Sequence, residues 1–385
     1  MRVLILGGDG YLGWPTAMHL SRLGYEVAVV DSYLKRNIAQ KLRIRPLIES
    51  PYMEERAQIW KALTGWNILV YVGDITDYDF LKKTTLSFHP SAIVHYGEIP
   101  SAPYSQLNQA TSWQTIQNNL QATMNVMWII KEMDPDIHLI KLGTMGEYGT
   151  PNIDIEEGFI DISINGRRDR LPFPKLPGSF YHLSKVQDSD MLYLGVRIWG
   201  LRVTDLNQGP VYGIETDESL LDSENRLMPT FHYDEFWGTV LNRFCAQAAA
   251  GVPLTVYGKG GQKRGFLDIR DTLQCVRLAI ENPANTAEFR VMNQFTEIFS
   301  VTELAEKVVS TGNQMSLMVK MQNTENPRHE AEEHYYNAKN TNLLALGLKP
   351  HYLNDHVIAG MIEKALQYRD HIDREAILPG KAKWK

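Results

Sequence analysis

The chain has 385 residues, of which 44% are hydrophobic and 22% charged, and its formal net charge is −6 at pH 7. These values are typical of a soluble globular protein that is long enough for one large domain and a smaller lobe. The mild negative charge argues against a general nucleic-acid-binding role. No apolar run reaches the length of a membrane span or a signal peptide, so we expect a cytoplasmic protein without a membrane partner.

The N-terminal segment combines an apolar strand, residues 3–6, with a glycine-rich turn. The glycines of this turn are Gly7, Gly10 and Gly13. Glycine lets the backbone turn tightly and approach a diphosphate, which then lies on the N–H groups of the next helix. We expect that helix to begin near Tyr11 and Leu12. The pattern predicts a dinucleotide-binding turn.

A second apolar strand, residues 26–30, ends in Asp31. A carboxylate at this point accepts hydrogen bonds from an adenosine ribose and favours NAD over NADP. Lys35 and Arg36 follow closely and can tolerate a phosphate, so NAD is favoured but not established. The other expected cofactor contacts follow this strand or the next ones: Ser32, Arg36, Asp74, Ile75, Tyr96, Gly97 and Asn118.

Strand-like runs and helical patterns alternate through the first half of the chain, with further apolar runs at residues 68–75, 91–98 and 137–144. Such alternation is typical of βαβ units and predicts an α/β fold with a Rossmann-type, doubly wound parallel sheet. Ligands of these sheets bind beyond the carboxyl ends of the strands.

The second half is less regular, and its composition suggests a division into two parts. We expect residues 1–200 to form the NAD-binding domain, with residues 240–285 returning to it. Residues 205–240 and 286–350 are expected to form a smaller, mixed α/β substrate-binding lobe. Residues 351–385 should supply a C-terminal helix and tail.

Two segments and two side chains outside the sheet also allow predictions. Residues 151–177 form a long irregular insertion, which we expect to cover the substrate. The helix predicted at residues 118–133 and the helix from Tyr181 form either a dimer face or ordinary core contacts. Cys245 and Cys275 are expected to be buried hydrophobic residues, and two thiols make no zinc site, so no metal is predicted.

The strongest catalytic signal is the pair Tyr181 and Lys185, which the spacing places on one face of a helix. An unperturbed tyrosine titrates near ~10, and a neighbouring ammonium group favours its phenolate form. Thr144, at the end of a predicted strand, is expected to lie near this pair. Together they predict a dehydrogenase in which Tyr181 transfers a proton.

Five sequence runs go beyond this general pattern and resemble the UDP-sulfoquinovose synthase family, a branch of the extended short-chain dehydrogenases that act on nucleotide sugars. The runs are residues 141–158, 180–185, 204–209, 254–262 and 330–339. The likeness extends from Met1 to about Leu353. Its narrowest parts are the Thr-Met-Gly-Glu-Tyr-Gly run from Thr144 and the paired glutamates before His334.

The resemblance implies a reaction that converts UDP-glucose and sulfite to UDP-sulfoquinovose while NAD is recycled within the site. Carbon 4 is oxidised, water is lost across C5 and C6, sulfite adds at C6, and C4 is reduced again. We expect an enzyme that would be grouped with hydrolases acting on carbon–sulfur bonds. The family also implies a homodimer. Whether another protein delivers the sulfite, and whether the product enters sulfolipids or glycans, stays open.

The resemblance also assigns roles to residues. It makes Tyr181 the base for the C4 hydroxyl, with Lys185 lowering its pKa and holding the nicotinamide ribose, and with Thr144 bonding the reacting oxygen. Chemistry at C5 and C6 needs a separate acid–base set, for which His182 and Glu147 are the candidates. Which of these two is the C5 base stays open.

Two departures from related patterns bear on this assignment. Sugar 4,6-dehydratases carry an Asp-Glu pair after the threonine, whereas this chain has Met145 and Gly146 there and a carboxylate only at Glu147. We therefore include Met145 among the catalytic-site residues. The family's basic residue near Glu98 is replaced here by Pro100, so no sulfite-binding role transfers to that position.

The UDP-sugar needs hydrogen-bond donors, and arginine is well suited to a diphosphate. Arg264 and Arg328 match arginines that meet the diphosphate in related sugar enzymes. Asn207 is expected to contact a phosphate or the sugar, and Gln262 the sugar or sulfite.

Two other functions remain possible at this point. One is a different NAD-dependent nucleotide-sugar enzyme, either a 4,6-dehydratase or a 4-epimerase. The other is a protein that senses NAD without turnover, although such proteins usually lack the tyrosine or the lysine that Tyr181 and Lys185 provide here.

Overall fold

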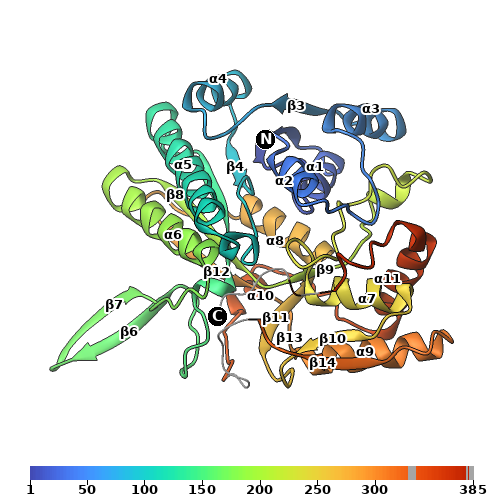
Figure 1. The fold of residues 1–385 in the computed structure, drawn as a ribbon. Coiled ribbons are helices and arrows are strands. Elements are labelled where there is room, and N and C mark those ends of the chain that lie inside the picture. The colour runs from blue at the N-terminus through green and yellow to red at the C-terminus, as the bar shows by residue number, and fades with distance from the viewer. Residues whose placement is uncertain (328–334, 379, 381–385) are drawn as a thin grey trace.

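The computed structural model describes residues 1–327, 335–378 and 380. Its centre is a seven-stranded sheet in which all neighbours are parallel and the order is β12-β8-β5-β4-β1-β2-β3 (Figure 1). These strands are β1 (Arg2–Leu6), β2 (Glu26–Asp31), β3 (Ile68–Val72), β4 (Ala92–His95), β5 (His138–Thr144), β8 (Arg202–Gln208) and β12 (Phe289–Gln294). Helices cover both faces of this sheet, and the central strands are apolar because their side chains are buried on both sides. The predicted Rossmann-type fold is confirmed.

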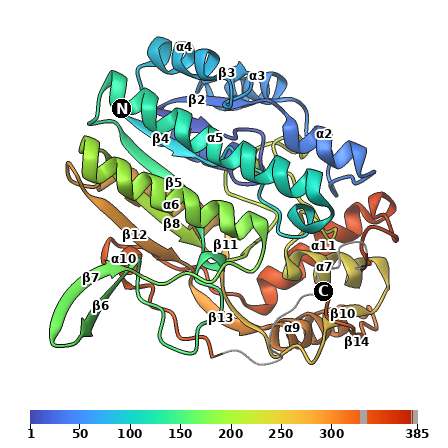
Figure 2. The same ribbon diagram turned by 60° about the vertical axis from the view of Figure 1, so that its left-hand side comes forward.

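Two layers of helices enclose this sheet. One layer contains α1 (Gly13–Arg22), α3 (Met53–Thr64), α8 (Ile269–Glu281) and the short α10 (Thr341–Ala345). The other contains α4 (Tyr78–Phe88), α5 (Gln109–Met133) and α6 (Phe180–Trp199). In Figure 2, α5 and α6 run side by side. The connection after β2 forms α2 (Leu34–Lys41), at the edge of the ligand cavity.

A smaller lobe packs around its own apolar core (Figure 1). Its helices are α7 (Val240–Ala250), α9 (Val301–Gln314) and α11 (Asp355–Gln367). Its strands form two small sheets, β10 (Leu254–Tyr257) with β14 (Met321–Thr324), and β9 (Val211–Tyr212), β11 (Lys263–Asp268) and β13 (Glu297–Ser300).

The expected boundaries between the two parts need correction. Strand β12 and the second part of β8 belong to the central sheet, although they fall in the ranges 286–350 and 205–240 that were assigned to the lobe. Within residues 240–285 only α8 packs on the sheet, whereas α7 and β10 join the core of the lobe. The chain crosses between the parts several times, and long irregular connections hide the strand–helix alternation on which the prediction relied.

The insertion at residues 151–177 also differs from expectation. It forms an antiparallel hairpin of β6 (Phe159–Ile164) and β7 (Arg167–Pro172), which projects from the body of the protein (Figures 1 and 2). The ring of Phe159 anchors its base against Tyr193 and Phe289. The expectation that this segment covers the substrate is therefore wrong for the hairpin, because Leu176 is the only residue of 151–177 that lines the cavity.

Helix starts follow from side-chain caps. Ser179 accepts a hydrogen bond from the backbone of His182, which sets the beginning of α6 just before the catalytic tyrosine. A capping box of Asn108 and Thr111 starts α5 earlier than the predicted residue 118.

Both cysteines are buried, Cys245 on α7 and Cys275 on α8, as predicted. No helix in the described ranges combines the length and the apolar composition that crossing a membrane requires.

The tight packing below the glycine turn predicts opposite effects for two Gly→Ala changes. A Cβ at Gly13 would overlap the carbonyl of Gly7, so Gly13→Ala should lower the free energy of unfolding by about 1–3 kcal/mol. Gly360 lies in α11 with open space around it, so Gly360→Ala should raise that energy by about 0.5–1 kcal/mol. Urea unfolding of both variants tests this, and a Gly13→Ala protein as stable as the unmodified chain would contradict it.

Candidate active site

A cavity of about 1970 Å³ lies at the carboxyl ends of the parallel strands and extends to the smaller lobe. The predicted residues of the glycine turn line one end of it: Gly7, Gly10, Tyr11, Leu12 and Gly13. The other predicted cofactor contacts line it as well: Asp31, Ser32, Arg36, Asp74, Ile75, Tyr96, Gly97 and Asn118. The structure thus brings these residues to one cavity, which Tyr181 lines as well, whereas Lys185, also expected to contact the cofactor, is buried and does not line it.

The glycine turn fits a dinucleotide diphosphate. Gly7 has φ +87°, and a Cβ there would lie 2.8 Å from the backbone nitrogen of Gly97. Gly13 has no room for a side chain below the turn. The backbone therefore closes on itself without side chains and leaves its N–H groups at the start of α1 open to an anion.

Asp31 is the acid at the end of β2, and backbone N–H groups orient its side chain. It accepts hydrogen bonds from Asp9 at 3.0 Å and from Tyr33 at 2.7 Å. Burial and the charge of Asp9 raise the pKa of Asp31 to about 6. Arg36 lines the cavity, but its guanidinium donates two hydrogen bonds to Asp9, at 2.6 and 2.7 Å. This engagement argues against the expected tolerance for a ribose phosphate at Arg36.

Tyr181 and Lys185 lie on the first turns of α6, and Thr144 lies at the end of β5. Tyr181 and Thr144 both line the cavity. The ammonium group of Lys185 is 6.0 Å from the Tyr181 ring centroid and 2.7 Å from a carboxylate oxygen of Glu98. It also donates to the carbonyl of Leu142 at 2.6 Å.

This geometry corrects the expected electrostatics. Lys185 was expected to lower the pKa of Tyr181, but burial and then the negative charge of Glu98 raise it. The ammonium group of Lys185 forms an ion pair with Glu98, and the carboxylate offsets the effect of this positive charge on the Tyr181 phenol. In the chain alone these neighbours favour the protonated form of the Tyr181 hydroxyl, so that a role as a base requires a further positive charge nearby.

His182 lies beside Tyr181 in the cavity, with ring centroids 5.2 Å apart. Its Nδ1 is 3.1 Å from the Ser179 hydroxyl, which orients the imidazole. A Cβ at Gly146 would overlap this imidazole, so the glycine creates the room for His182. Met145 also lines the cavity. The Met145-Gly146 departure from the dehydratase pattern is therefore coupled to the position of the histidine.

Glu147 does not lie at the cavity. Its carboxylate is fully buried, contacts the ammonium groups of Lys141, at 3.2 Å, and Lys175, and accepts from Ser189 at 3.0 Å. Burial alone would raise the pKa of Glu147, but the two lysines outweigh it and lower the pKa. Its burial and its partners contradict the expected proton transfer to substrate.

The predicted substrate contacts divide into three groups. Gln262 and Arg264 line the cavity at the lobe. Asn207 is fully buried away from it and donates to the hydroxyl of Tyr148 at 2.9 Å, so the expected sugar contact is wrong. Arg328, like the glutamates before His334, lies outside the described residues.

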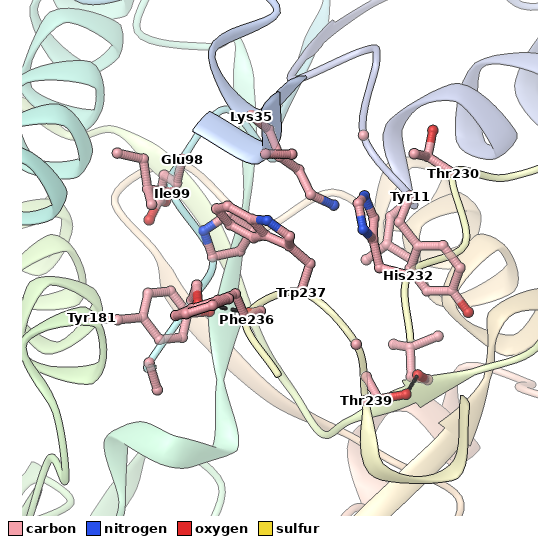
Figure 3. Close-up of a pocket in the computed structure, with 18 of the residues that line it drawn as sticks. Tyr11, Lys35, Glu98, Ile99, Tyr181, Thr230, His232, Phe236, Trp237 and Thr239 are labelled. Carbon is pink, nitrogen blue, oxygen red and sulfur yellow. Dashed lines mark hydrogen bonds between the residues drawn. The ribbon is translucent and has the colours of Figure 1, made fainter. Parts of the chain in front are cut away.

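Some cavity residues were missed from the sequence. Glu98 follows β4 and faces Tyr181 (Figure 3). Residues 228–239 cross the cavity and bring His232, Phe236 and Trp237 into it (Figure 3). The only sequence signal is an aromatic-rich run within an irregular stretch, which does not indicate a ligand by itself.

The fold and the site agree with comparisons to known proteins. A family model described as the NAD dependent epimerase/dehydratase family matches residues 3–293. The chain belongs to this family and is NAD-dependent.

Two relatives narrow the comparison. Over its full length the chain is 53% identical to a protein of Spinacia oleracea named UDP-sulfoquinovose synthase, chloroplastic, and covers 79% of that protein. It is 44% identical, again over its full length, to UDP-sulfoquinovose synthase of Sulfolobus acidocaldarius and covers 98% of it. These names and the family description do not support the term hydrolase, and that part of the sequence prediction is wrong.

Solved structures support the fold. UDP-glucose 4-epimerase from Bifidobacterium longum, in complex with NAD+ and UDP, superimposes with a TM-score of 0.70 at 19% identity. The alignment covers 96% of this chain and 99% of the epimerase.

The position of Glu147 predicts a structural effect of its loss. Glu147→Gln leaves the buried Lys141 and the partly exposed Lys175 without their common partner and should lower the free energy of unfolding by about 3–5 kcal/mol. Because the folded-state pKa is lowered, the contribution is complete above the unfolded pKa of ~4.3 and disappears as pH falls through the folded value. Unfolding measured between pH 2 and 7 tests both, because the folded-state pKa of Glu147 is about 2.

Glu132→Gln is the matched control, since Glu132 contacts only half-exposed partners such as Lys82. A Glu147→Gln protein as stable as this control at neutral pH would show that the buried pairs contribute little.

Proposed function

We propose that the protein synthesises UDP-sulfoquinovose from UDP-glucose and sulfite. The observation that carries this proposal is the identity of 53% over the full chain to a relative with that name. The site supports it, because a hydride-transfer set and a separate proton-transfer group lie in the same cavity. The overall reaction forms a carbon–sulfur bond at C6 and releases water.

The C4 step uses Thr144 and Tyr181 of the cavity wall, together with Lys185, which is buried beside Tyr181. Thr144 hydrogen-bonds the C4 oxygen, and the C4 hydroxyl gives its proton to Tyr181. Lys185, held by Glu98 and Leu142, bonds the nicotinamide ribose. When bound, NAD supplies the acceptor of the C4 hydride, which it later returns, and a positive charge that opposes the raised pKa of Tyr181.

The C5 and C6 steps use His182. The ketone at C4 acidifies the C5 hydrogen, and the imidazole removes it as a proton while the C6 hydroxyl leaves as water. The sulfur of sulfite then bonds to C6, C5 regains a proton, and the hydride returns to C4. With Glu147 buried beneath the site, the geometry favours His182 as the C5 base. Arg264 and Gln262 are placed to bind the UDP-sugar.

The decisive experiment is incubation of the purified protein with UDP-glucose, with and without sulfite, followed by mass spectrometry of the sugar nucleotide. A mass gain that depends on sulfite is expected. A 4-keto-6-deoxy sugar formed without sulfite would instead indicate a 4,6-dehydratase, and UDP-galactose would indicate a 4-epimerase.

Tyr181→Phe provides the control for this assay. It should abolish product formation while NAD still binds, because only the phenolic hydroxyl is removed. Full activity of this variant would exclude Tyr181 from the proposed proton transfer.

We also propose a homodimer through α5 and α6. Their outer faces carry apolar side chains at helical spacing, Met124 and Trp128 on α5 and Leu194 and Ile198 on α6. Leu194 and Ile198 are 53% and 56% exposed. In a dimer in which these helices face their copies, the four exposed apolar side chains would be buried, as is common for exposed apolar patches.

Leu194→Glu tests this interface, because it places a charge among the apolar side chains that the dimer would bury. The variant should be monomeric by size exclusion with light scattering, whereas the unmodified chain should be dimeric. Leu63→Glu is the control, since Leu63 is exposed on the distant α3. If the Leu194→Glu and Leu63→Glu variants have the same mass in solution, the proposed interface through α5 and α6 is wrong.

A further inference from the structure

A crossing segment, residues 228–239, spans the cavity and is attached on both sides. The carbonyl of Phe231 accepts from the backbone of Leu47 at 2.9 Å. The carbonyl of Phe236 accepts from the Ser101 hydroxyl at 2.6 Å, and its ring packs in a small core with residues of α2. The segment therefore has a defined position over the cavity rather than that of a loose loop.

Beneath this segment, Lys35 of α2 points into the cavity toward His232, with Tyr11 of the glycine turn beside them (Figure 3). The ammonium group of Lys35 is 5.3 Å from the Trp237 ring centroid. Burial lowers the pKa of Lys35 to about 8. Within the described part of the chain no hydrogen-bond acceptor is recorded for this ammonium group.

The carboxylates around Lys35 are committed to other donors. Asp9 binds the guanidinium groups of Arg36 and Arg56. Asp31 accepts from two backbone N–H groups. Asp234 accepts from Nδ1 of His232 at 3.0 Å and from the backbone of the crossing segment. Lys35 is half-buried, and an ammonium group whose neighbouring carboxylates already have other partners favours an anion beside it.

His232 shows the same requirement. Asp234 holds its Nδ1, which leaves Nε2 as the ring atom available to the cavity. Burial and then the charge of Lys35 lower the pKa of His232. An anion between Lys35 and His232 would pair with both groups and remove their mutual repulsion.

The position of the pair identifies the anion. Lys35 lines the same cavity as the glycine turn, whose Tyr11 lies near it, and as Asp31 at the ribose position (Figure 3). The diphosphate of a dinucleotide lies between these two points. We propose that Lys35 and His232 bind the diphosphate of NAD, as a second set of contacts in addition to the N–H groups of the glycine turn.

This assignment implies that the crossing segment retains the bound cofactor. The segment closes over the diphosphate and carries one of its ligands, so NAD leaves only when the segment opens. Retention suits a reaction in which one hydride is removed and returned to the same sugar. The inference rests on the NAD dependence of the family and not on sulfite as the substrate.

The test compares ligands with and without the diphosphate on the full-length protein. Calorimetry with NAD, ADP and adenosine should show that Lys35→Met weakens NAD and ADP by about tenfold, as expected for a lost charged hydrogen bond, and leaves adenosine unchanged. His232→Gln should have a similar effect and should speed the release of bound NAD. Lys35→Arg, which keeps the charge, should retain most of the affinity.

Lys41→Met is the matched control, because Lys41 is exposed at the end of the same helix. Equal weakening of adenosine and ADP would show that Lys35 only supports the fold, and unchanged NAD and ADP affinities would also overturn the proposal. A raised KM for sulfite with unchanged ADP binding would assign the pair to a different anion. Failure of sulfite-dependent synthesis would not affect these binding results.

Discussion

The buried ammonium group of Lys141 connects the elements that carry the catalytic side chains. It lies 3.2 Å from Glu147 and 3.4 Å from Asp205, and it donates to Ser189 at 3.0 Å. These partners belong to the turn after β5, to β8 and to α6, while Lys141 itself precedes Thr144 on β5. Removing each charge from water costs several kcal/mol, and only simultaneous pairing recovers it. The relative positions of the four elements are therefore strongly constrained.

This constraint explains which side chains are buried and which ones line the cavity. Because Glu147 is used to hold the interior, the groups left at the cavity surface are Tyr181 and His182. Gly146 gives the imidazole its space. A second buried ion pair, between Lys185 and Glu98, holds the Lys185 ammonium group near Tyr181. The charged groups below the surface thus position the two side chains, Tyr181 and His182, for which we propose proton transfer.

The cavity joins two kinds of surface. One is the edge of the parallel sheet, where strand ends and the glycine turn provide backbone N–H groups and Asp31. The other comes from residues far along the chain, including the crossing segment 228–239 and Arg264 of the lobe. Cofactor and sugar nucleotide can therefore meet only because the chain passes several times between sheet and lobe.

The sequence by itself determined the parallel sheet, the glycine turn with Asp31, and the pair Tyr181 and Lys185. The sheet follows from the alternation of apolar strands and helical patterns along the chain, and the other two features follow from residue types at short spacing in the sequence. Only the tertiary structure decided that Glu147 and Asn207 point inward, that Lys185 pairs with a residue of β4's connection, and that residues 228–239 cross the cavity. Those outcomes depend on charged and polar partners from distant segments, and no local pattern records which of them a buried side chain will meet.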